Sequence, residues 1–313
     1  MNIPVLDLTL FTQGNDDDKA NFVSSLGNAF ESIGFVSIKN HGMDEKVIYD
    51  LYSGVEQFFS LPTEIKKKYE IKNLAGQRGY TSFGKEHAKG SSNADLKEFF
   101  QYGQPTGSEV SSDITHKNVQ VVENESFNSS LFESFLKFEQ IGSSILQAIA
   151  IYLGLPSNYF DDYIIDGNSI IRAIHYPPII TEPNSSIRAE QHEDINLITL
   201  LVGASSEGLQ ILSKNNIWLP INAAAGEIVV NVGDMLQRLT NNKLKSTTHR
   251  VVNPPREKWN TSRYSIPFFL HPVSTMSLAC LPSCISEENP SNYIDYTAGE
   301  YLDERLREIG LKK

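Results

Sequence analysis

From residue 168 onward the sequence consists of short apolar runs separated by Pro, Gly and Asn, roughly every 8 to 12 residues. Strands joined by short connections produce this spacing, and several in succession are typical of an antiparallel sandwich or barrel. Asn241 and Asn242 mark one predicted tight connection between two strands. The runs that we predict to be strands are 169–176, 197–202, 209–212, 228–232, 247–252, 263–270 and 276–281.

The first half of the chain has a different periodicity. Apolar residues recur at helical spacing over 16–33, 47–59 and 128–153, and Asn15, or an aspartate just after it, can cap the first helix. No repeat or low-complexity linker separates the two halves. We therefore predict one domain of mixed α and β class, a double-sheet jelly roll supported by helices. Its parts are a helix-rich N-terminal part (1–160), a jelly-roll core (165–285) and a C-terminal helix (297–313).

Composition excludes several classes of function. A formal charge of −11 disfavours a nucleic-acid partner, because such proteins usually carry a clustered basic face. No stretch approaches the roughly 18 apolar residues of a membrane span, and the N-terminus lacks the order of a signal peptide. Cys280 and Cys284 have no second pair with which to form a zinc site. We expect a cytoplasmic protein with no membrane partner, and the sequence does not indicate its oligomeric state.

The tripeptide His192-Glu193-Asp194 is the first candidate for chemistry. On an extended segment, residues two apart point to the same face, so His192 and Asp194 can reach one metal ion while Glu193 points away. A histidine from a distant strand would complete the two-histidine, one-carboxylate set typical of non-haem Fe(II) oxygenases. The other histidines of the chain have no carboxylate two residues away, and His175 is predicted to face away from the side of its strand that holds Tyr176.

A second cluster follows downstream. His249 lies in the strand-like run 246–252, and Arg263 and Ser265 share one face of a later strand. A guanidinium fork beside a hydroxyl forms a receptor for a carboxylate, through two charge-assisted hydrogen bonds and a third from the hydroxyl. The alternative is an ordinary salt bridge from Arg263 to one of the 38 acidic residues.

His192-x-Asp194, His249 and Arg263-x-Ser265, in this order and at these separations, resemble the isopenicillin N synthase-like family of Fe(II)/2-oxoglutarate-dependent dioxygenases. The resemblance covers the chain from about residue 3 to about residue 275. It includes the segments 34–42, 78–80, 95–98, 198–201, 208–210, 231–234, 240–241 and 246–251.

The resemblance implies a distorted double-stranded β-helix with Fe(II) at its open end, held by His192, Asp194 and His249. It implies that 2-oxoglutarate chelates the iron and that its far carboxylate is held by Arg263 and Ser265, with Tyr176 as a further hydroxyl donor. With O2 as the other cosubstrate, decarboxylation to succinate and CO2 would then be coupled to hydroxylation, desaturation or cyclisation of a small organic substrate.

The chain departs from the family pattern at three positions. Ile174 stands where an asparagine often precedes the Tyr-Pro pair, so a contact to the 1-carboxylate of 2-oxoglutarate is absent or comes from elsewhere. Glu193 and Asn196 stand where threonine and glycine are common. These differences bear on which substrate the protein accepts more than on the iron site. By their position relative to family segments, the residues predicted to form the substrate pocket are Arg78, Tyr80, Phe83, Phe99 and Gln101.

Three other functions compete with this interpretation. Some members of the family use iron and O2 without 2-oxoglutarate, and an Arg-x-Ser pair does not distinguish them. A non-catalytic jelly roll could bind a metal or a carboxylate as a sensor, although all three ligands are present. A zinc hydrolase can also be built from two histidines and an aspartate, but it leaves Arg263, Ser265 and Tyr176 without a role.

Overall fold

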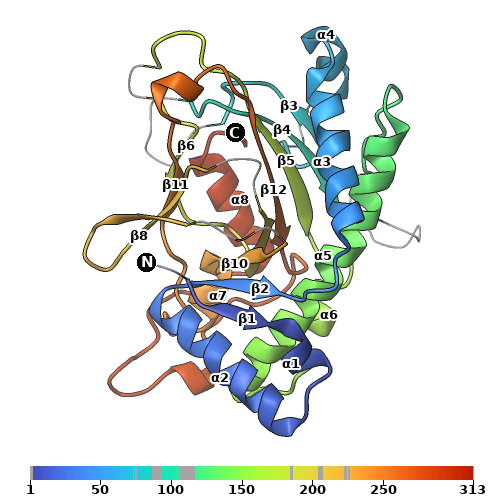
Figure 1. Cartoon of the computed structure of the whole chain (residues 1–313). Coiled ribbons are helices and arrows are strands. Elements are labelled where there is room, and N and C mark those ends of the chain that lie inside the picture. Colours follow the sequence, from blue (N-terminus) through green and yellow to red (C-terminus); the bar gives the residue numbers. More distant parts are fainter. Residues whose placement is uncertain are drawn as a thin grey trace.

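The structure is a computed structural model that describes residues 3–72, 74, 76–86, 94–105, 117–183, 186–203, 207–221, 224 and 226–312. At its centre two β-sheets of unequal size face each other (Figure 1). The large sheet has eight strands in the order β1-β2-β10-β7-β12-β5-β4-β3. Their bounds are β1 (Val5–Asp7), β2 (Phe35–Lys39), β10 (Ile228–Val232), β7 (Ile198–Val202), β12 (Arg263–Leu270), β5 (Ile170–Tyr176), β4 (Glu98–Gly103) and β3 (Gly79–Thr81).

The small sheet has four strands in the order β6-β11-β8-β9. Every strand pair in the two sheets is antiparallel except β1 with β2. The arrangement confirms the predicted mixed α and β class with a distorted jelly-roll core. The bounds of the small-sheet strands are β6 (Ala189–His192), β11 (His249–Val251), β8 (Leu209–Leu212) and β9 (Trp218–Pro220).

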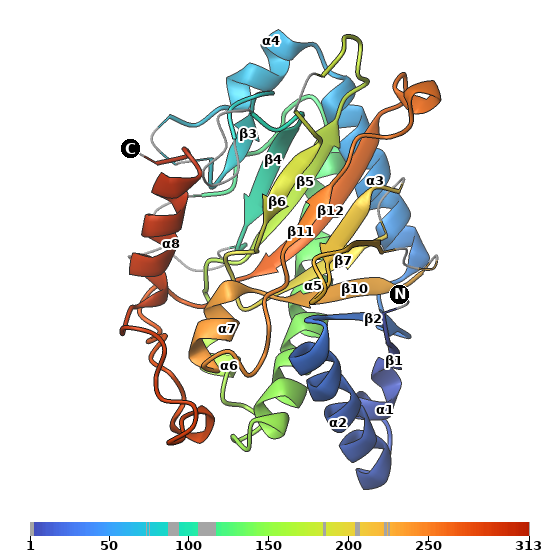
Figure 2. The same cartoon turned by 90° about the vertical axis from the view of Figure 1, so that its left-hand side faces the viewer.

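The long helices support one face of the large sheet, as the apolar periodicity of the first half predicts. Helix α3 (Glu45–Ser60) packs against α5 (Glu125–Tyr152), and both contact the outer face of the sheet (Figure 2). Gly142 permits this close approach, because a Cβ at that position would collide with Cδ1 of Leu270. The remaining helices are α1 (Leu8–Thr12), α2 (Asp16–Ser32), α4 (Thr63–Lys66), α6 (Asp161–Ile164), α7 (Asp234–Leu239) and α8 (Ala298–Glu308), with 3-10 turns at Lys67–Tyr69, Arg256–Lys258 and Pro282–Cys284.

Side-chain caps fix where two of these helices begin. The Asn15 side chain accepts a hydrogen bond from the Asp18 N–H at 3.0 Å, and the Asp18 carboxylate accepts one from the Asn15 N–H at 3.2 Å. This reciprocal pair satisfies two backbone donors at the start of α2, and the predicted Asn15 cap is confirmed. Thr297 and Glu300 form the same pair at the start of α8.

Two predictions for the second half are wrong. Residues 276–281 do not form a strand of either sheet: the Leu278 N–H donates to the carbonyl of Tyr296 at 2.8 Å, so this run pairs with the C-terminal segment. The turn at Asn241 and Asn242 does not follow a strand, because the short helix α7 intervenes. Both asparagines have positive φ, 48° and 66°, a conformation that asparagine tolerates better than most residues.

Strands from both halves of the sequence form the large sheet. β1 to β4 come from the helix-rich N-terminal part, and two of them pair with strands of the core: β2 with β10, and β4 with β5. The division into parts at 1–160, 165–285 and 297–313 within one domain remains a prediction. Among the described residues, no helix combines the length and the apolar character that a membrane span requires.

Candidate functional site

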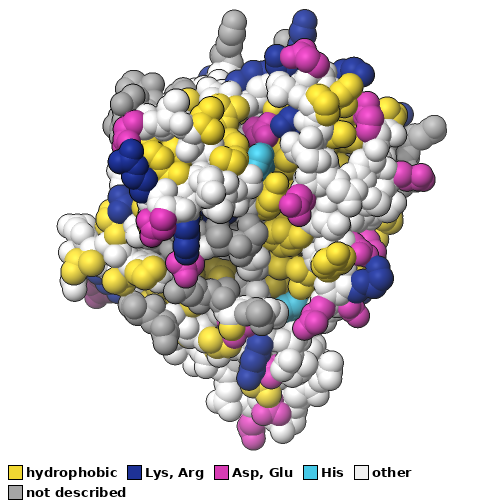
Figure 3. Space-filling view, turned by 45° about the horizontal axis from the view of Figure 1, so that its top comes forward, with side chains coloured by type: hydrophobic (Ala, Val, Ile, Leu, Met, Phe, Trp, Pro, Cys, Tyr) yellow, Lys and Arg dark blue, Asp and Glu magenta, His cyan; other side chains and the backbone are white. Residues whose placement is uncertain are grey.

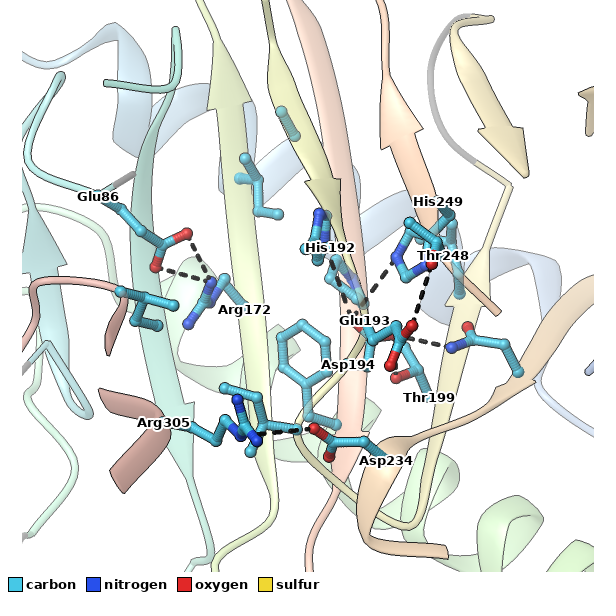
Figure 4. Close-up of a pocket in the computed structure, with 18 of the residues that line it drawn as sticks. Glu86, Arg172, His192, Glu193, Asp194, Thr199, Asp234, Thr248, His249 and Arg305 are labelled. Carbon is cyan, nitrogen blue, oxygen red and sulfur yellow. Dashed lines mark hydrogen bonds and ion pairs between the residues drawn. The ribbon is translucent and has the colours of Figure 1, made fainter. Parts of the chain in front are cut away.

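Two histidines and an aspartate converge beside the small sheet. His192 is the last residue of β6 and lies directly opposite His249, the first residue of β11, while Asp194 follows two residues after β6 ends. One ligand atom from each residue lies within 4.8 Å of the others. Asp194 Oδ1 is 3.9 Å from His192 Nε2 and 3.6 Å from His249 Nε2, and Figure 4 shows the three side chains pointing toward one another.

Both imidazoles direct their Nε2 atom toward Asp194 Oδ1. His192 Nδ1 lies 2.7 Å from the carbonyl of Glu190, and His249 Nδ1 lies 3.1 Å from the carbonyl of Thr247. A carbonyl only accepts, so each Nδ1 donates its proton and the Nε2 of a neutral ring keeps its lone pair. Burial, followed by the neighbouring His249, lowers the pKa of His192 and favours the neutral ring. This is the tautomer and charge state of a metal-binding histidine.

The large sheet holds the Asp194 carboxylate. Its Oδ2 accepts hydrogen bonds from Thr199 Oγ1 of β7 at 2.7 Å and from Asn231 Nδ2 of β10 at 2.8 Å. Burial opposes ionisation, but the two histidines and these two donors outweigh it and lower the pKa of Asp194. The carboxylate is therefore charged at neutral pH, and its Oδ1 faces the histidines.

The predicted carboxylate receptor lies on the large sheet. Arg263 on β12 is directly opposite Tyr176 at the end of β5, and Ser265 is opposite Ile174. The Arg263 guanidinium lies over the Tyr176 ring, 5.0 Å from its centre. Arg263 is 1% exposed, and Tyr176 and Ser265 are also buried. The structure thus brings the three predicted residues together on one wall of a cavity.

Arg188 is a second buried arginine close to Tyr176 that the sequence did not indicate, although it is not part of the cavity lining. It is 2% exposed, and its guanidinium lies 5.9 Å from the centre of the Tyr176 ring. Burial, with a smaller contribution from the charge of Arg263, lowers its pKa to about 10. Nη2 donates to the carbonyl of Thr261 at 3.1 Å, but the buried Nε has no hydrogen-bond partner among the described residues. Two neighbouring buried guanidinium groups suit a ligand that carries a carboxylate.

A cavity of about 700 Å³ connects the histidine-aspartate cluster to this receptor. Figure 3 shows a hollow on this side of the molecule with hydrophobic side chains gathered around it. Helix α8 supplies part of the wall, through Tyr301, Leu302, Arg305 and Leu306. The Tyr301 hydroxyl donates to the Asp234 carboxylate at 2.7 Å, which binds this helix to α7.

Only Gln101 of the five residues predicted for the substrate pocket lines this cavity. Phe99 is 1% exposed and lies behind Arg172, whose guanidinium is 4.5 Å from the centre of its ring. Tyr80 faces the helices and donates its hydroxyl proton to the buried Glu98. The other two residues also lie outside the lining: the Arg78 guanidinium packs against Gly103, and Phe83 is 49% exposed.

The remaining predictions about single residues concern orientation. Ile174 lines the cavity and packs with other apolar residues, so it offers no hydrogen bond there. Glu193 accepts a hydrogen bond from Thr248 at 3.0 Å and is not part of the three-residue cluster. His175 bonds to Glu98 at 2.8 Å, away from the cavity lining, as its strand position predicts. His87 and His116 lie outside the described residues.

Comparisons with known proteins agree with this geometry. Residues 3–123 match the family model of the non-haem dioxygenase in morphine synthesis N-terminal domain, and residues 167–272 match that of the 2OG-Fe(II) oxygenase superfamily. The 2-oxoglutarate-dependent dioxygenase frbA of Dothideomycetidae sp. (strain 11243) is 30% identical to this chain, over 98% of this chain and 96% of its own. The chain belongs to the 2OG-Fe(II) oxygenase superfamily.

Solved structures give the same assignment. A putative 2OG-Fe(II) oxygenase family protein from Caulobacter crescentus is 40% identical, with a TM-score of 0.86 over 98% of this chain and 99% of that chain. A full-length Neurospora crassa protein in complex with alpha-KG, which is 2-oxoglutarate, is 29% identical, with a TM-score of 0.87 over 97% and 95%. The same Neurospora crassa protein has also been solved with alpha-KG and thymine, at 28% identity over 97% and 96%.

The protein is therefore an Fe(II)/2-oxoglutarate-dependent dioxygenase. It uses Fe(II), 2-oxoglutarate and O2, and it couples oxidative decarboxylation of 2-oxoglutarate to succinate and CO2 with oxidation of a small-molecule substrate. The predicted family, enzyme class and cofactors are confirmed.

Proposed function

We propose that His192, Asp194 and His249 bind the iron, and that Arg263, Ser265 and Tyr176 bind the far carboxylate of 2-oxoglutarate. One observation carries the proposal. The Nε2 atoms of both histidines face Asp194 Oδ1, while Thr199 and Asn231 hold the other carboxylate oxygen, Oδ2. The same cavity is also lined by the three proposed 2-oxoglutarate-binding residues. Fe(II) bound there supplies the site at which O2 and the oxoacid react. The chain's own residues position both reactants and limit the access of water.

The ligand assignment can be tested with a matched pair of neighbouring substitutions. Asp194→Asn and Glu193→Gln change adjacent carboxylates to amides of the same shape. We expect Asp194→Asn to weaken Fe(II) binding at least ten-fold, measured by anaerobic titration, and Glu193→Gln to leave it within two-fold of wild type. Weak iron binding by Glu193→Gln with normal binding by Asp194→Asn would overturn the assignment.

The 2-oxoglutarate receptor has its own readout. Arg263→Met should retain Fe(II) but lose the visible absorption that appears when 2-oxoglutarate chelates the iron under anaerobic conditions. Ser265→Ala removes one donor and should weaken 2-oxoglutarate binding about 3- to 10-fold, in line with the loss of one hydrogen bond. Normal 2-oxoglutarate binding by Arg263→Met would refute this role.

We infer that the substrate is a compact, uncharged, cyclic molecule of the size of a single nucleobase. The Neurospora crassa complex with alpha-KG and thymine supports this class, because that protein resembles this chain over nearly its whole length. The cavity volume of about 700 Å³ must hold 2-oxoglutarate as well, which favours a small substrate. Thymine and uracil, with proline as an amino-acid control, should be compared as stimulants of 2-oxoglutarate-dependent O2 uptake. Gain of one oxygen atom by a pyrimidine supports the inference, and turnover of proline alone refutes it.

The same assay separates the alternative functions. O2 uptake with substrate but without 2-oxoglutarate would indicate an oxidase of the same family. A non-catalytic sensor would bind 2-oxoglutarate and produce no succinate.

A further inference from the structure

One buried imidazole that lines the cavity has a ring nitrogen without a hydrogen-bond partner among the described residues. His271 directly follows β12 and lines the cavity beyond Phe269, at the opposite end of this strand from Arg263. His271 is 6% exposed, and its buried Nδ1 makes no hydrogen bond with any described residue. A buried polar atom without a partner is costly, so native structures rarely retain one unless a ligand or water satisfies it.

Arg172 supplies a second group with unused hydrogen-bonding capacity. It lies on the cavity side of β5, where its Nε donates to Gln101 at 2.9 Å. Its Nη1 donates to Glu86 at 3.1 Å (Figure 4). Within the described part of the chain its Nη2 makes no hydrogen bond. The guanidinium also lies 5.3 Å from the centre of the Phe269 ring. Two hydrogen-bond acceptors and the rings of Phe99 and Phe269 thus hold the guanidinium of this cavity-lining residue, and the bonds to Gln101 and Glu86 do not use Nη2.

The charged side chains clustered around Arg172 balance one another. Glu86 pairs with Arg172 at 3.1 Å and with Lys97 at 2.6 Å, and Lys97 also pairs with Asp95 at 2.8 Å. The four side chains carry two positive and two negative charges and are largely buried. A carboxylate bound here would add a charge without a counterion, which is costly in a buried site. An uncharged polar group can meet Nη2 and the imidazole without that cost.

We propose that Arg172 and His271 bind the polar edge of a ring amide or imide in the substrate. A carbonyl oxygen accepts from Arg172 Nη2, the adjacent N–H pairs with a ring nitrogen of His271, and the ring lies along Phe269. This assignment rests on the proposed function, because it names the residues that select the uncharged cyclic substrate. Arg172 and His271 set specificity, whereas the iron ligands and the 2-oxoglutarate receptor are the same for any substrate.

The proposal is tested by comparing KM values for substrate and for 2-oxoglutarate. Thymine is the probe, and 3-methylthymine is the analogue in which a methyl group replaces the imide N–H between two carbonyls. In Arg172→Met and His271→Leu, KM for thymine should rise about 10- to 100-fold, as expected when a buried partner in a polar recognition site is removed. KM for 2-oxoglutarate should stay within about two-fold. His271→Gln, which keeps a donor and an acceptor, should recover much of the loss. The ratio of KM in His271→Leu to KM in wild type should be smaller for 3-methylthymine than for thymine.

Turnover of 2-oxoglutarate without substrate shows that each variant is folded and holds iron. Unchanged KM for thymine in both variants, with this basal turnover intact, would overturn the proposal. A wild-type enzyme with basal turnover that no ring amide stimulates would overturn both the substrate class and this assignment, but not the iron and 2-oxoglutarate sites. Absence of basal turnover and of Fe(II) binding in the wild type would instead contradict the proposed metal site.

Discussion

The hydrogen bond from Thr199 to Asp194 should control how tightly the site holds iron. Thr199→Val removes the hydroxyl that donates to Asp194 Oδ2 at 2.7 Å while nearly preserving the side-chain shape. It also removes the acceptor of Asn196 Nδ2, which lies 2.8 Å from Thr199 Oγ1. A hydrogen bond to a charged group contributes about 1.5–3 kcal/mol, which corresponds to a factor of about 10 to 150 in affinity. We therefore expect Fe(II) to bind 10- to 100-fold more weakly, the range typical for the loss of a group that supports a metal ligand.

Anaerobic competition between the protein and a chelator measures this affinity, and circular dichroism shows whether the variant is folded. Thr199→Ser is the matched control, because it keeps the hydroxyl and loses only a methyl group. It should bind Fe(II) within about three-fold of wild type. If Thr199→Val is folded and binds iron as tightly as Thr199→Ser, the hydrogen bond does not position Asp194 and the reasoning fails.

Three further predictions concern stability and cofactor binding. Burial lowers the pKa of His271 from 6.5 to about 3, so below pH 6.5 the unfolded chain gains a proton that the folded chain does not, and stability is lost as pH falls. The free energy of unfolding of wild type and of His271→Gln should be measured by denaturation at pH 7.5 and at pH 5. Between these pH values wild type should lose about 1–2 kcal/mol more than His271→Gln, and an equal loss would contradict a buried neutral imidazole. Gly142→Ala should destabilise by about 1–3 kcal/mol because its Cβ collides with Leu270, whereas Gly203→Ala, with open space around its Cβ, should be nearly neutral in the same thermal melts. Arg188→Met should raise KM for 2-oxoglutarate about 3- to 10-fold with Fe(II) affinity unchanged, because one of two neighbouring guanidinium groups is lost; an unchanged KM would show that Arg188 serves packing alone.

The strands and the convergence of the site could be predicted from local patterns and the family resemblance. Period-two alternation places Arg263 and Ser265 on one face, and the structure puts both on the cavity wall. The same rule could not choose between the faces of 98–103, because apolar and polar residues occupy both sides of this buried strand. Gln101 points into the cavity, whereas Tyr80 on the neighbouring strand points toward the helices.

Residues defined by tertiary contacts had no signal in the sequence. Arg188 becomes notable only because folding buries it beside Arg263 of β12 and Tyr176 of β5. His271 stands next to Pro272 with no carboxylate two residues away, and only the folded chain shows that its Nδ1 has no hydrogen-bond partner among the described residues. The failed strand at 276–281 has the same origin, since the C-terminal segment takes its backbone hydrogen bonds.

The two sheets contribute differently to the proposed iron site. His192 and His249 pair across the small sheet, whereas Asp194 is held by Thr199 and Asn231 of the large sheet, which also carries Arg263. Asp194 and the 2-oxoglutarate receptor are therefore fixed relative to each other within one sheet, and the histidines approach from the other. Thr199→Val removes one of the two hydrogen bonds that hold the aspartate and leaves the receptor residues unchanged. It should therefore weaken Fe(II) binding more than it weakens the binding of 2-oxoglutarate to the iron-loaded protein. The ratio of these two fold-changes in affinity measures how far the position of Asp194 is independent of the 2-oxoglutarate receptor.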